Sequence, residues 1–409
     1  MKTLNDFNMK TKKPWEVEGV ERREVKLGNL VIEKPKYGLT AKAKDKGKTV
    51  FLRITDIDDK GDIKNNGFKF VDLDETEKAK YDVKKGDLLL ARSGSVGNFF
   101  IAFKDYPDWI YASYLIRFRL DLNKIHLMFV KYFLSSQFFK RWVSFQKRPG
   151  AQPNINAKEF SSFKIPLPFR NGKPDLETQK KIVEYIEANF SRIDKILEKK
   201  KKELEQLDEF WESVLEQAFK PKEGEEWREV GFNKLISREK YQVGKVKVRN
   251  GLTNSGKILV VDQSQDLIRG YLDDEKLKYR GPLPLIIFGD HTKVIKFIDF
   301  PFIVGADGVK ILIPNKDLLY PKYFYWLLRE VKLPDRGYAR HFKFLKQATY
   351  LIPFRNGKPD LEKQKEIANY LDSVYEKIKA LKEKIQNQIT QIEEMKESIL
   401  DEMFNHDRE

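Results

Sequence analysis

Apolar residues recur at alternating steps of three and four along two long stretches of the chain. The first runs from Glu177 to Phe219 without a proline or glycine, and the second follows Leu361 in the same way. This spacing is typical of helices that bury one face in a coiled coil. We predict a helix of about 44 residues in each stretch. We expect the two helices to pair, because neither apolar stripe is stable in water. The steps Leu381–Ile385–Ile389 are four and four, which predicts a local unwinding of the supercoil. The predicted interface residues are Ile186, Ile193, Leu204, Leu207, Leu371, Ile378, Leu381 and Ile392.

Short β-rich runs, separated by turns that contain glycine, fill the remainder of the chain. Amphipathic stretches near residues 126–139 and 321–328 predict one short helix at the end of each set of strands. The pattern predicts an α+β fold in which two mixed, strand-rich domains alternate with the two long helices. The runs predicted as strands are residues 50–54, 87–91, 99–102 and 114–118 in the first set, and 246–248, 258–261, 285–288 and 311–313 in the second.

An internal repeat organises the chain. The ten residues from Pro168 to Glu177 recur unchanged from Pro353 to Glu362, and Arg23-Glu24-Val25 recurs as Arg228-Glu229-Val230. A copy of that length is not chance. A duplicated domain without functional meaning is the simpler explanation, but the two halves diverge in one specific place only. The predicted segments are a polar N-terminal tail (1–14), a first domain (15–167), a first helix (168–220), a second domain (221–352) and a second helix (353–409).

Positive charge is concentrated in the two domains. The chain has 78 Lys and Arg against 62 Asp and Glu, which gives a net charge of +16. Residues 176–219 carry −3 and residues 361–409 carry −4, so the remainder carries +23. A balance this basic favours a polyanionic partner, most often nucleic acid. The run Lys199–Lys202 lies among glutamates and is better explained as a solvated helix face than as a DNA-binding patch.

The sequence contains no motif for catalysis or for a tightly held cofactor. Cysteine is absent, which excludes disulfides and thiolate chemistry, and the four histidines lack metal-ligand spacing. The segment Gly251–Lys257 approaches a phosphate-binding loop, but Ile258 replaces the Ser or Thr that holds Mg²⁺. No secretory signal is visible, and no apolar run reaches the length of a membrane span. We therefore expect a soluble cytoplasmic protein that is not itself an enzyme and binds no metal.

Several motifs, taken in order, resemble the specificity subunit of type I restriction–modification systems. Residues 150–156 (Gly-Ala-Gln-Pro-Asn-Ile-Asn) close the first domain as in that family, and residues 165–168 (Ile-Pro-Leu-Pro) resemble its proline-rich entry to a conserved helix. Residues 86–97 are similar to its Gly-Asp-Ile-Leu strand and glycine turn. In the second domain, residues 288–292 and 338–341 are similar to motifs of another target-recognition subtype. Two departures are a ten-residue turn before each long helix, where many members have a shorter link, and the lack of one proline before the second helix.

This resemblance implies a division of labour within a larger complex. Each domain would be a target recognition domain for double-stranded DNA, and the two helices would pack antiparallel and fix the distance between the domains. Half-sites about one DNA turn apart would leave a gap of roughly 5–8 bp in an asymmetric bipartite site. The helices would bind methyltransferase subunits and, through them, restriction subunits. S-adenosylmethionine, ATP and Mg²⁺ would belong to those partners, so that the assembled complex is a DNA adenine methyltransferase and ATP-dependent endonuclease, while this chain binds no cofactor.

Polar residues in loops are the candidates for contact with DNA, because specificity comes from a few side chains at base edges. Alternatives remain for several of them. The glycine turn at residues 93–97 either cradles phosphates or only connects two strands. Gln152 and Asn154 either read bases or cap their loop, and Asp290 and His291 either read bases or pair to fix a hairpin. The candidates are Lys64, Asn65, Asn66, Arg92, Ser93, Ser95, Gln152 and Asn154 in the first domain, and Asp290, His291, Thr292, Arg340 and His341 in the second.

Two other classes of function compete with DNA recognition. An enzyme, such as a fused nuclease or methyltransferase, is disfavoured by the missing nucleotide and metal motifs. A coiled-coil scaffold that binds DNA without specificity, outside any restriction system, is disfavoured by the separation of basic domains from mildly acidic helices. Binding that resists salt, or no binding at all, would favour the scaffold, because affinity for phosphates falls steeply with salt.

Overall fold

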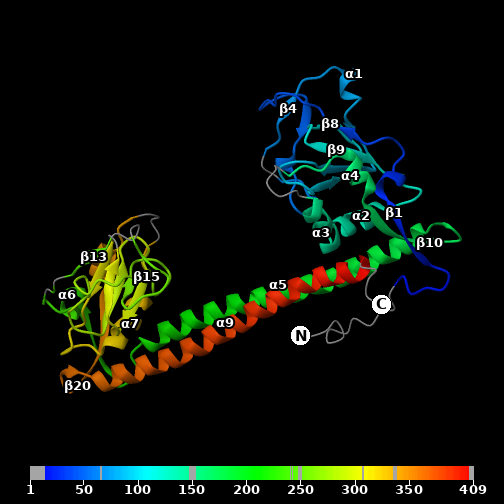
Figure 1. Cartoon of the computed structure of the whole chain (residues 1–409). Helices are drawn as coiled ribbons and strands as arrows, with labels where there is room; N and C mark the ends of the chain where they lie inside the picture. Colours follow the sequence, from blue (N-terminus) through cyan, green and yellow to red (C-terminus); the bar gives the residue numbers. More distant parts are fainter. Residues whose placement is uncertain are drawn as a thin grey trace. The chain divides into compact units, whose positions relative to one another are not determined.

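The computed structural model describes residues 14–64, 67–146, 153–239, 241, 243–246, 251–305, 308–334 and 339–404. Contacts divide the chain into two compact units, of which unit 1 comprises residues 1–200 with 387–409 and unit 2 comprises residues 201–386. Each unit therefore combines one of the two predicted domains with about half of each long helix (Figure 1). None of the described helices is long and apolar enough to cross a membrane.

Unit 1 is built around strand β6, whose five residues Asp87–Ala91 are all buried. An unbroken buried run of this kind is typical of a central strand that is covered on both faces. The other strands of unit 1 are β1 (Glu21–Lys26), β2 (Lys36–Tyr37), β3 (Thr49–Leu52), β4 (Phe70–Val71), β5 (Asp82–Val83), β7 (Phe99–Ile101), β8 (Tyr106–Tyr111), β9 (Leu115–Arg119), β10 (Lys164–Arg170) and β11 (Lys173–Pro174). Its shorter helices are η2 (Leu27–Asn29), η3 (Ile54–Asp56), α1 (Glu75–Lys78), α2 (Leu127–Ser135), α3 (Gln137–Gln146) and α4 (Ala157–Ser162).

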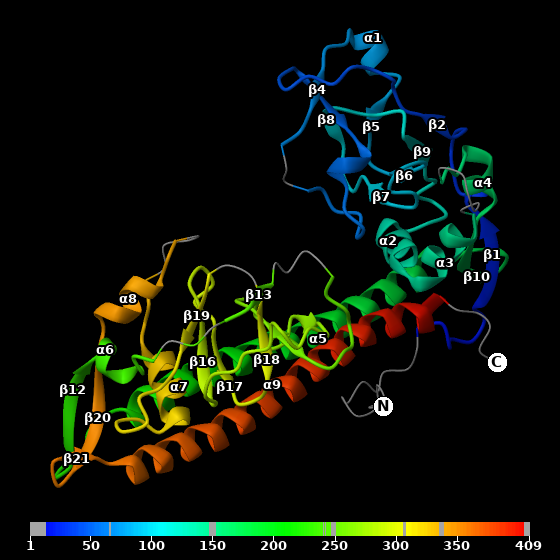
Figure 2. The same ribbon diagram turned by 60° about the vertical axis from the view of Figure 1, so that its left-hand side comes forward.

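Unit 2 has the equivalent central strand β16 (Leu285–Gly289), which is also buried along its whole length (Figure 2). Its other strands are β12 (Glu226–Gly231), β13 (Lys245–Val246), β14 (Leu259–Val261), β15 (Gly270–Tyr271), β17 (Ile295–Ile298), β18 (Phe302–Gly305), β19 (Val309–Leu312), β20 (Thr349–Arg355) and β21 (Lys358–Pro359). Its shorter helices are α6 (Phe232–Leu235), α7 (Pro321–Glu330) and α8 (Phe342–Gln347).

The two domains share one plan of strands although their sequences diverge. In the first domain, β6 lies between β9 and β7, and β3 pairs in parallel with β8 and antiparallel with β4. In the second domain, β16 lies between β19 and β17, and β14 pairs in parallel with β18 and antiparallel with β15. The order of these strands along the chain is also the same. Positions in one domain can therefore be matched to positions in the other through their backbone hydrogen bonds.

The long helices α5 (Leu176–Ala218) and α9 (Leu361–Phe404) have 43 and 44 residues, close to the predicted length. Within unit 1, Lys396 of α9 donates to Asp194 of α5, and within unit 2, Lys382 donates to Asp208. From the Lys382–Asp208 pair to the Lys396–Asp194 pair, the residue number increases in α9 and decreases in α5. The two helices are therefore antiparallel. The buried face of α9 follows a seven-residue repeat at Leu371, Ile378, Ile385, Ile392 and Ile399.

One of the predicted interface residues is wrong. Leu381 is 47% exposed, whereas Ile378 and Ile385 on either side of it are at most 9% exposed. The partly buried position between these two isoleucines belongs to Lys382, which the prediction overlooked because lysine is polar. With Lys382 counted, the steps of three and four continue unbroken, and the stutter predicted from apolar residues alone is not needed. Of the other predicted interface residues, Leu204 and Leu207 are half-buried, and Ile186, Ile193, Leu371, Ile378 and Ile392 are buried.

A buried glutamine joins each domain to the start of its long helix. Gln179 of α5 accepts a hydrogen bond from the His126 backbone N–H at 2.8 Å and donates to the Lys124 carbonyl at 3.0 Å. Gln364 of α9 makes the same two contacts in unit 2, where it accepts from Tyr320 N–H and donates to the Leu318 carbonyl, again at 2.8 and 3.0 Å. Both glutamine side chains are fully buried. The repeated helix thus holds each divergent domain through backbone groups, which are independent of the domain's own side chains.

Candidate nucleic-acid interface

The candidate residues of the first domain meet where strand β6 ends. Arg92 and Ser93 directly follow this strand, and Asn154 lies in the segment that leads into α4. The Ile155 N–H donates to the Arg92 carbonyl at 2.9 Å, and Ser93 and Asn154 form an antiparallel bridge. In addition, Arg92 Nε donates to Asn154 Oδ1 at 3.1 Å. The structure therefore brings together candidates from two loops that are 62 positions apart in the sequence.

Tyr37, which sequence reasoning missed, completes this cluster. The Arg92 guanidinium lies 4.8 Å from the centre of the Tyr37 ring, a cation–π contact. The Tyr37 hydroxyl accepts a hydrogen bond from the Ala157 N–H at 3.1 Å, so the ring is itself held in place. Tyr37 stands in a two-residue strand within a lysine-rich stretch. No local signal marks such a tyrosine, because its importance arises only from a contact that is distant in sequence.

The glycine turn beside the cluster is a tight connection between β6 and β7. Gly94 and Gly97 both have positive φ angles, +70° and +92°, which favour glycine. A Cβ atom on Gly97 would lie 2.9 Å from the Val143 side chain, so α3 packs closely on this turn. Ser95 at the tip is exposed, whereas Ser93 is only 8% exposed. Close to the end of α3, Phe145 is 86% exposed.

The second domain places its candidates at the matching point of strand β16. Asp290 follows that strand; its N–H donates to the Gly308 carbonyl, and its carbonyl accepts from the His341 N–H, both at 2.8 Å. Arg92 makes the corresponding bonds to Tyr114 and from Ile155. Asp290 therefore occupies the position of Arg92, and Arg340, directly before His341, occupies the position of Asn154. The arginine therefore lies in the first of the two matched loops in the first domain and in the second of them in the second domain.

Burial revises the interpretation of two candidates in the second domain. Asp290 is 4% exposed, and its Oδ1 accepts from the Phe342 N–H at 2.9 Å, which caps helix α8. Its Oδ2 lies 3.7 Å from Lys310 Nζ. His341 is fully buried, and its Nδ1 lies 3.2 Å from the Asp290 carbonyl oxygen. Neither side chain is accessible to a DNA base here, so we now assign both to the support of the loops around them.

The accessible polar groups of the second cluster are gathered by Gln263, another residue that the sequence did not single out. Its Oε1 accepts from the His291 N–H at 3.3 Å, and its carbonyl accepts from the Thr292 hydroxyl at 2.7 Å. Thr292 and Arg340 are exposed, and His291 is half-buried. Gln263 follows β14, and in the first domain Ile54 holds the matching place after β3, beside the glycine turn.

Arg92 differs from two arginines in the core of the first domain, Arg117 and Arg119, in whether a carboxylate balances its positive charge. Hydrogen bonds to the fully buried Asp87 raise the pKa of Arg119, which is thereby fixed as a cation inside a network of carboxylates. Arg117 likewise pairs with Glu33 and Asp82. Among the residues that the structure describes, no carboxylate pairs with Arg92. Its positive charge is therefore available to a ligand, whereas the other two stabilise the fold.

The remaining candidates are not drawn into either cluster. Lys64 is exposed, and its backbone N–H donates to the Asp56 carbonyl at 2.8 Å. Asn65, Asn66 and Gln152 lie outside the described residues. Across the part of the chain that is described, no group of three or more potential ligands is arranged to hold a metal ion.

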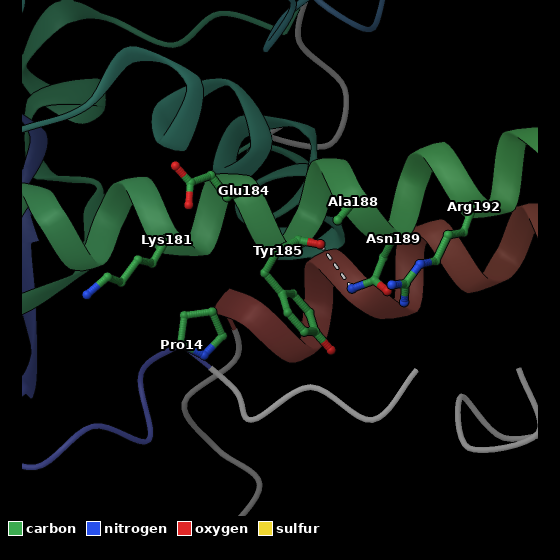
Figure 3. A pocket seen from close by; sticks show the side chains of 7 residues that line it. All are labelled: Pro14, Lys181, Glu184, Tyr185, Ala188, Asn189 and Arg192. Carbon is green, nitrogen blue, oxygen red and sulfur yellow. Dashed lines mark hydrogen bonds between the residues drawn. The ribbon is translucent and has the colours of Figure 1, made fainter. Parts of the chain in front are cut away.

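A pocket of about 320 Å³ lies elsewhere in unit 1, along helix α5 (Figure 3). Tyr185, Asn189 and Arg192 line it, and Pro14 closes one side. The Asn189 side chain donates to the Tyr185 carbonyl at 3.0 Å, so its amide serves the helix itself. The pocket contains none of the candidate residues.

Comparison with known proteins bears directly on the first of the two domains. Residues 19–206 match the family model of the type I restriction modification DNA specificity domain, from just before β1 to a point within α5. The first half of the chain is thus similar to a type I DNA specificity domain. The recognition of this family from sequence motifs is thereby confirmed.

Two curated relatives are specificity subunits from Escherichia coli. The chain is 25% identical over 209 residues to the specificity subunit of the type I restriction enzyme EcoBI, and 25% identical over 204 residues to that of EcoKI from strain K12. The alignments span 50% and 48% of this chain and 42% of each relative. The chain thus matches less than half the length of these two proteins.

Solved structures extend the likeness in fold to nearly the whole chain. A chain from a study of complex assembly and conformational transition of the type I R-M system has a TM-score of 0.67 at 18% identity, with 94% of this chain and 98% of that chain covered. The HsdS subunit from Thermoanaerobacter tengcongensis has a TM-score of 0.52 at 17% identity, with coverage of 96% and 98%. The predicted α+β class, with two strand-rich domains and two long paired helices, is confirmed.

Proposed function

We propose that this chain is the DNA-recognition subunit of a type I restriction–modification complex, and that each domain reads one half of a bipartite site. The observation that carries the proposal is the equivalence of the two clusters. Each domain gathers exposed polar side chains and one unpaired or exposed arginine at the end of the same central strand. The first of these domains is similar to a family of DNA specificity domains.

The difference between the clusters favours an asymmetric site. At matching backbone positions the first domain has Arg92 and Asn154, and the second has Asp290 and Arg340. Hydrogen-bond donors therefore project from different loops in the two domains. Since bases are distinguished by the pattern of donors and acceptors at their edges, two such surfaces select different sequences.

The paired helices supply the spacing between the half-sites in this proposal. A helix of 43 residues extends about 65 Å at 1.5 Å per residue. Its antiparallel partner repeats the same sequence pattern, so the chain carries two copies of one plan, as a homodimer does. Dimers of this kind read half-sites about one DNA turn apart, which gives a gap of roughly 5–8 bp.

Partner subunits supply the chemistry in this proposal. The chain itself acts as a non-catalytic scaffold on which methyltransferase subunits, and through them restriction subunits, assemble. The names of the relatives and of the similar complex structure support this role. S-adenosylmethionine, ATP and Mg²⁺ are then bound by the partners.

Selection from a pool of randomised duplex DNA tests the proposal. The full chain, assembled with its methyltransferase partner, is expected to enrich two different short motifs separated by a fixed number of unspecified base pairs. Its affinity should also fall steeply as salt rises, because the basic domains displace counterions from phosphates. Enrichment of no motif would refute the recognition role and leave non-specific binding. A single motif without a gap would refute the assignment of one half-site to each domain.

A further inference from the structure

We propose that Arg92 reads a guanine in the major groove, and that the half-site of the first domain therefore contains a G·C pair at the position that this side chain faces. The inference rests on the proposed function and adds to it a reading residue and the base that it recognises. It depends on three features of Arg92: how the guanidinium is oriented, which of its N–H groups are used, and how its charge is balanced.

The orientation of the guanidinium is fixed on two sides before any DNA binds. Asn154 Oδ1 accepts from Nε at 3.1 Å, and the Tyr37 ring lies against the guanidinium at 4.8 Å. Tyr37 is in turn anchored by the Ala157 N–H at 3.1 Å. A long side chain that is already ordered loses little conformational entropy on binding. Such preorganisation favours a geometric contact over a loose charge interaction.

The hydrogen bond to Asn154 also determines which edge of the guanidinium remains for a ligand. Arginine can present a fork from Nε and one Nη atom, or a fork from its two Nη atoms. With Nε donating to Asn154, the fork of the two Nη atoms remains. Among the described residues, only Asn154 accepts a hydrogen bond from this guanidinium. Guanine offers two adjacent acceptors, O6 and N7, on its major-groove edge, and these match an arginine fork.

The charge of Arg92 supports the same conclusion. Guanine has only acceptors at the matching edge, whereas adenine and cytosine present an amino donor in the major groove, which a cation with only donors does not satisfy. Within the described residues, Arg92 has no carboxylate partner, in contrast to Arg117 and Arg119. It is half-buried and lies beside exposed Asn154. The fork is thus charged, ordered and accessible.

The second domain provides an internal comparison. Its residue at the position of Arg92 is Asp290, which is buried and accepts from Phe342 N–H. We therefore expect Asp290 to make no contact with a base in the second half-site. Its exposed arginine, Arg340, stands at the position of Asn154 and provides a matched control on the other half-site.

The test is DNA selection and affinity measurement with the whole chain assembled with its methyltransferase partner, comparing the wild type with Arg92→Ala, Arg92→Lys and Arg340→Ala. Arg92→Lys preserves the charge but lacks the fork. Both Arg92 variants are expected to lose preference for guanine at one position of one half-site, by about 5- to 150-fold against other bases. The second half-site and the gap should be unchanged in these variants. Arg340→Ala should leave the guanine of the first half-site in place.

Three results would overturn the inference in different ways. A wild-type protein without any sequence preference refutes the proposed function as well. Two clear half-sites that persist in Arg92→Ala refute the role of Arg92 alone. A uniform loss of affinity for all sequences, with the salt dependence lowered by about one counterion and the selected motif intact, assigns Arg92 to a phosphate and also refutes the reading of guanine. An intact second half-site in each Arg92 variant establishes that the protein is folded.

Discussion

Replacing Gln179 with leucine tests how a divergent domain is attached to the repeated helix. The fully buried glutamine satisfies two backbone groups at the start of α2, the N–H of His126 and the carbonyl of Lys124. Leucine has a similar volume but neither a donor nor an acceptor. Both backbone groups would then remain unsatisfied against the helix, unless the junction between α5 and the domain opens to admit water.

The cost can be worked out from these two contacts. A buried backbone group that loses its partner costs about 1–3 kcal/mol. Two such groups amount to about 2–5 kcal/mol, once some relaxation is allowed. Each 1.4 kcal/mol is about a tenfold change in an equilibrium, so opening of this junction should become about 30- to 3,000-fold more frequent. The control Lys180→Ala removes an exposed ion pair to Glu184 and should cost less than about 1 kcal/mol.

Hydrogen–deuterium exchange measures this opening segment by segment. Gln179→Leu should accelerate exchange in residues 124–130 and leave residues 318–324 unchanged. Gln364→Leu, its counterpart in unit 2, should do the reverse, because it holds Tyr320 and Leu318 in the same way. Exchange within twofold of the wild type in both segments would refute the idea that these glutamines hold the domains. Acceleration in both segments by either variant would refute the independence of the two junctions.

Three further predictions concern the paired helices and the stability of unit 2. Ile378→Asp should destabilise unit 2 by several kcal/mol in denaturant unfolding, because it puts a charge at a buried position. Leu381→Asp, at an exposed position, should change stability by less than about 1 kcal/mol. Equal effects of the two substitutions would contradict the revised interface. The hydrogen bond from Lys363 lowers the pKa of Glu225 to about 2, so its stabilisation of unit 2 is complete above about pH 4.5 and is lost as the pH falls toward 2. Glu225→Gln should flatten the acid limb of the unfolding curve over that range, and an unaltered limb would argue against this contribution. Inserting seven residues into each helix at register-matched points should lengthen the gap in the selected DNA site by about 3 bp, since seven residues add about 10 Å; an unchanged gap would contradict the spacing role.

The helices could be predicted from the sequence because their signal is periodic and local. A stripe of apolar residues that repeats over more than 40 residues still predicts the helix correctly when one of its positions is misassigned. Leu381 was misjudged because apolarity was taken as the sign of the interface, while the structure uses Lys382, whose charge is paired with Asp208 across the helices. A lysine can occupy such a position when its aliphatic stem is buried and its ammonium reaches a carboxylate at the edge.

The candidate site could be predicted only in part. Loops and polar chemistry located Arg92 and Asn154, but their contact depends on a chain segment that returns after 62 residues, and a sequence does not give such pairing. Tyr37 and Gln263 were missed for the same reason. Asp290 and His341 were chosen as loop residues, yet they are buried, because the carboxylate caps α8 and the imidazole packs beneath the loop. Polarity alone does not tell a group that reads a ligand from one that satisfies the backbone.

The most direct test of the central proposal, that the two domains each read half of one DNA site, is a methylation map of the source cell's genome with and without this gene. The proposal predicts a gapped, asymmetric motif that is methylated in the wild type and unmethylated after deletion, with two unlike half-sites separated by roughly 5–8 bp. A map that is identical in the two strains would contradict it.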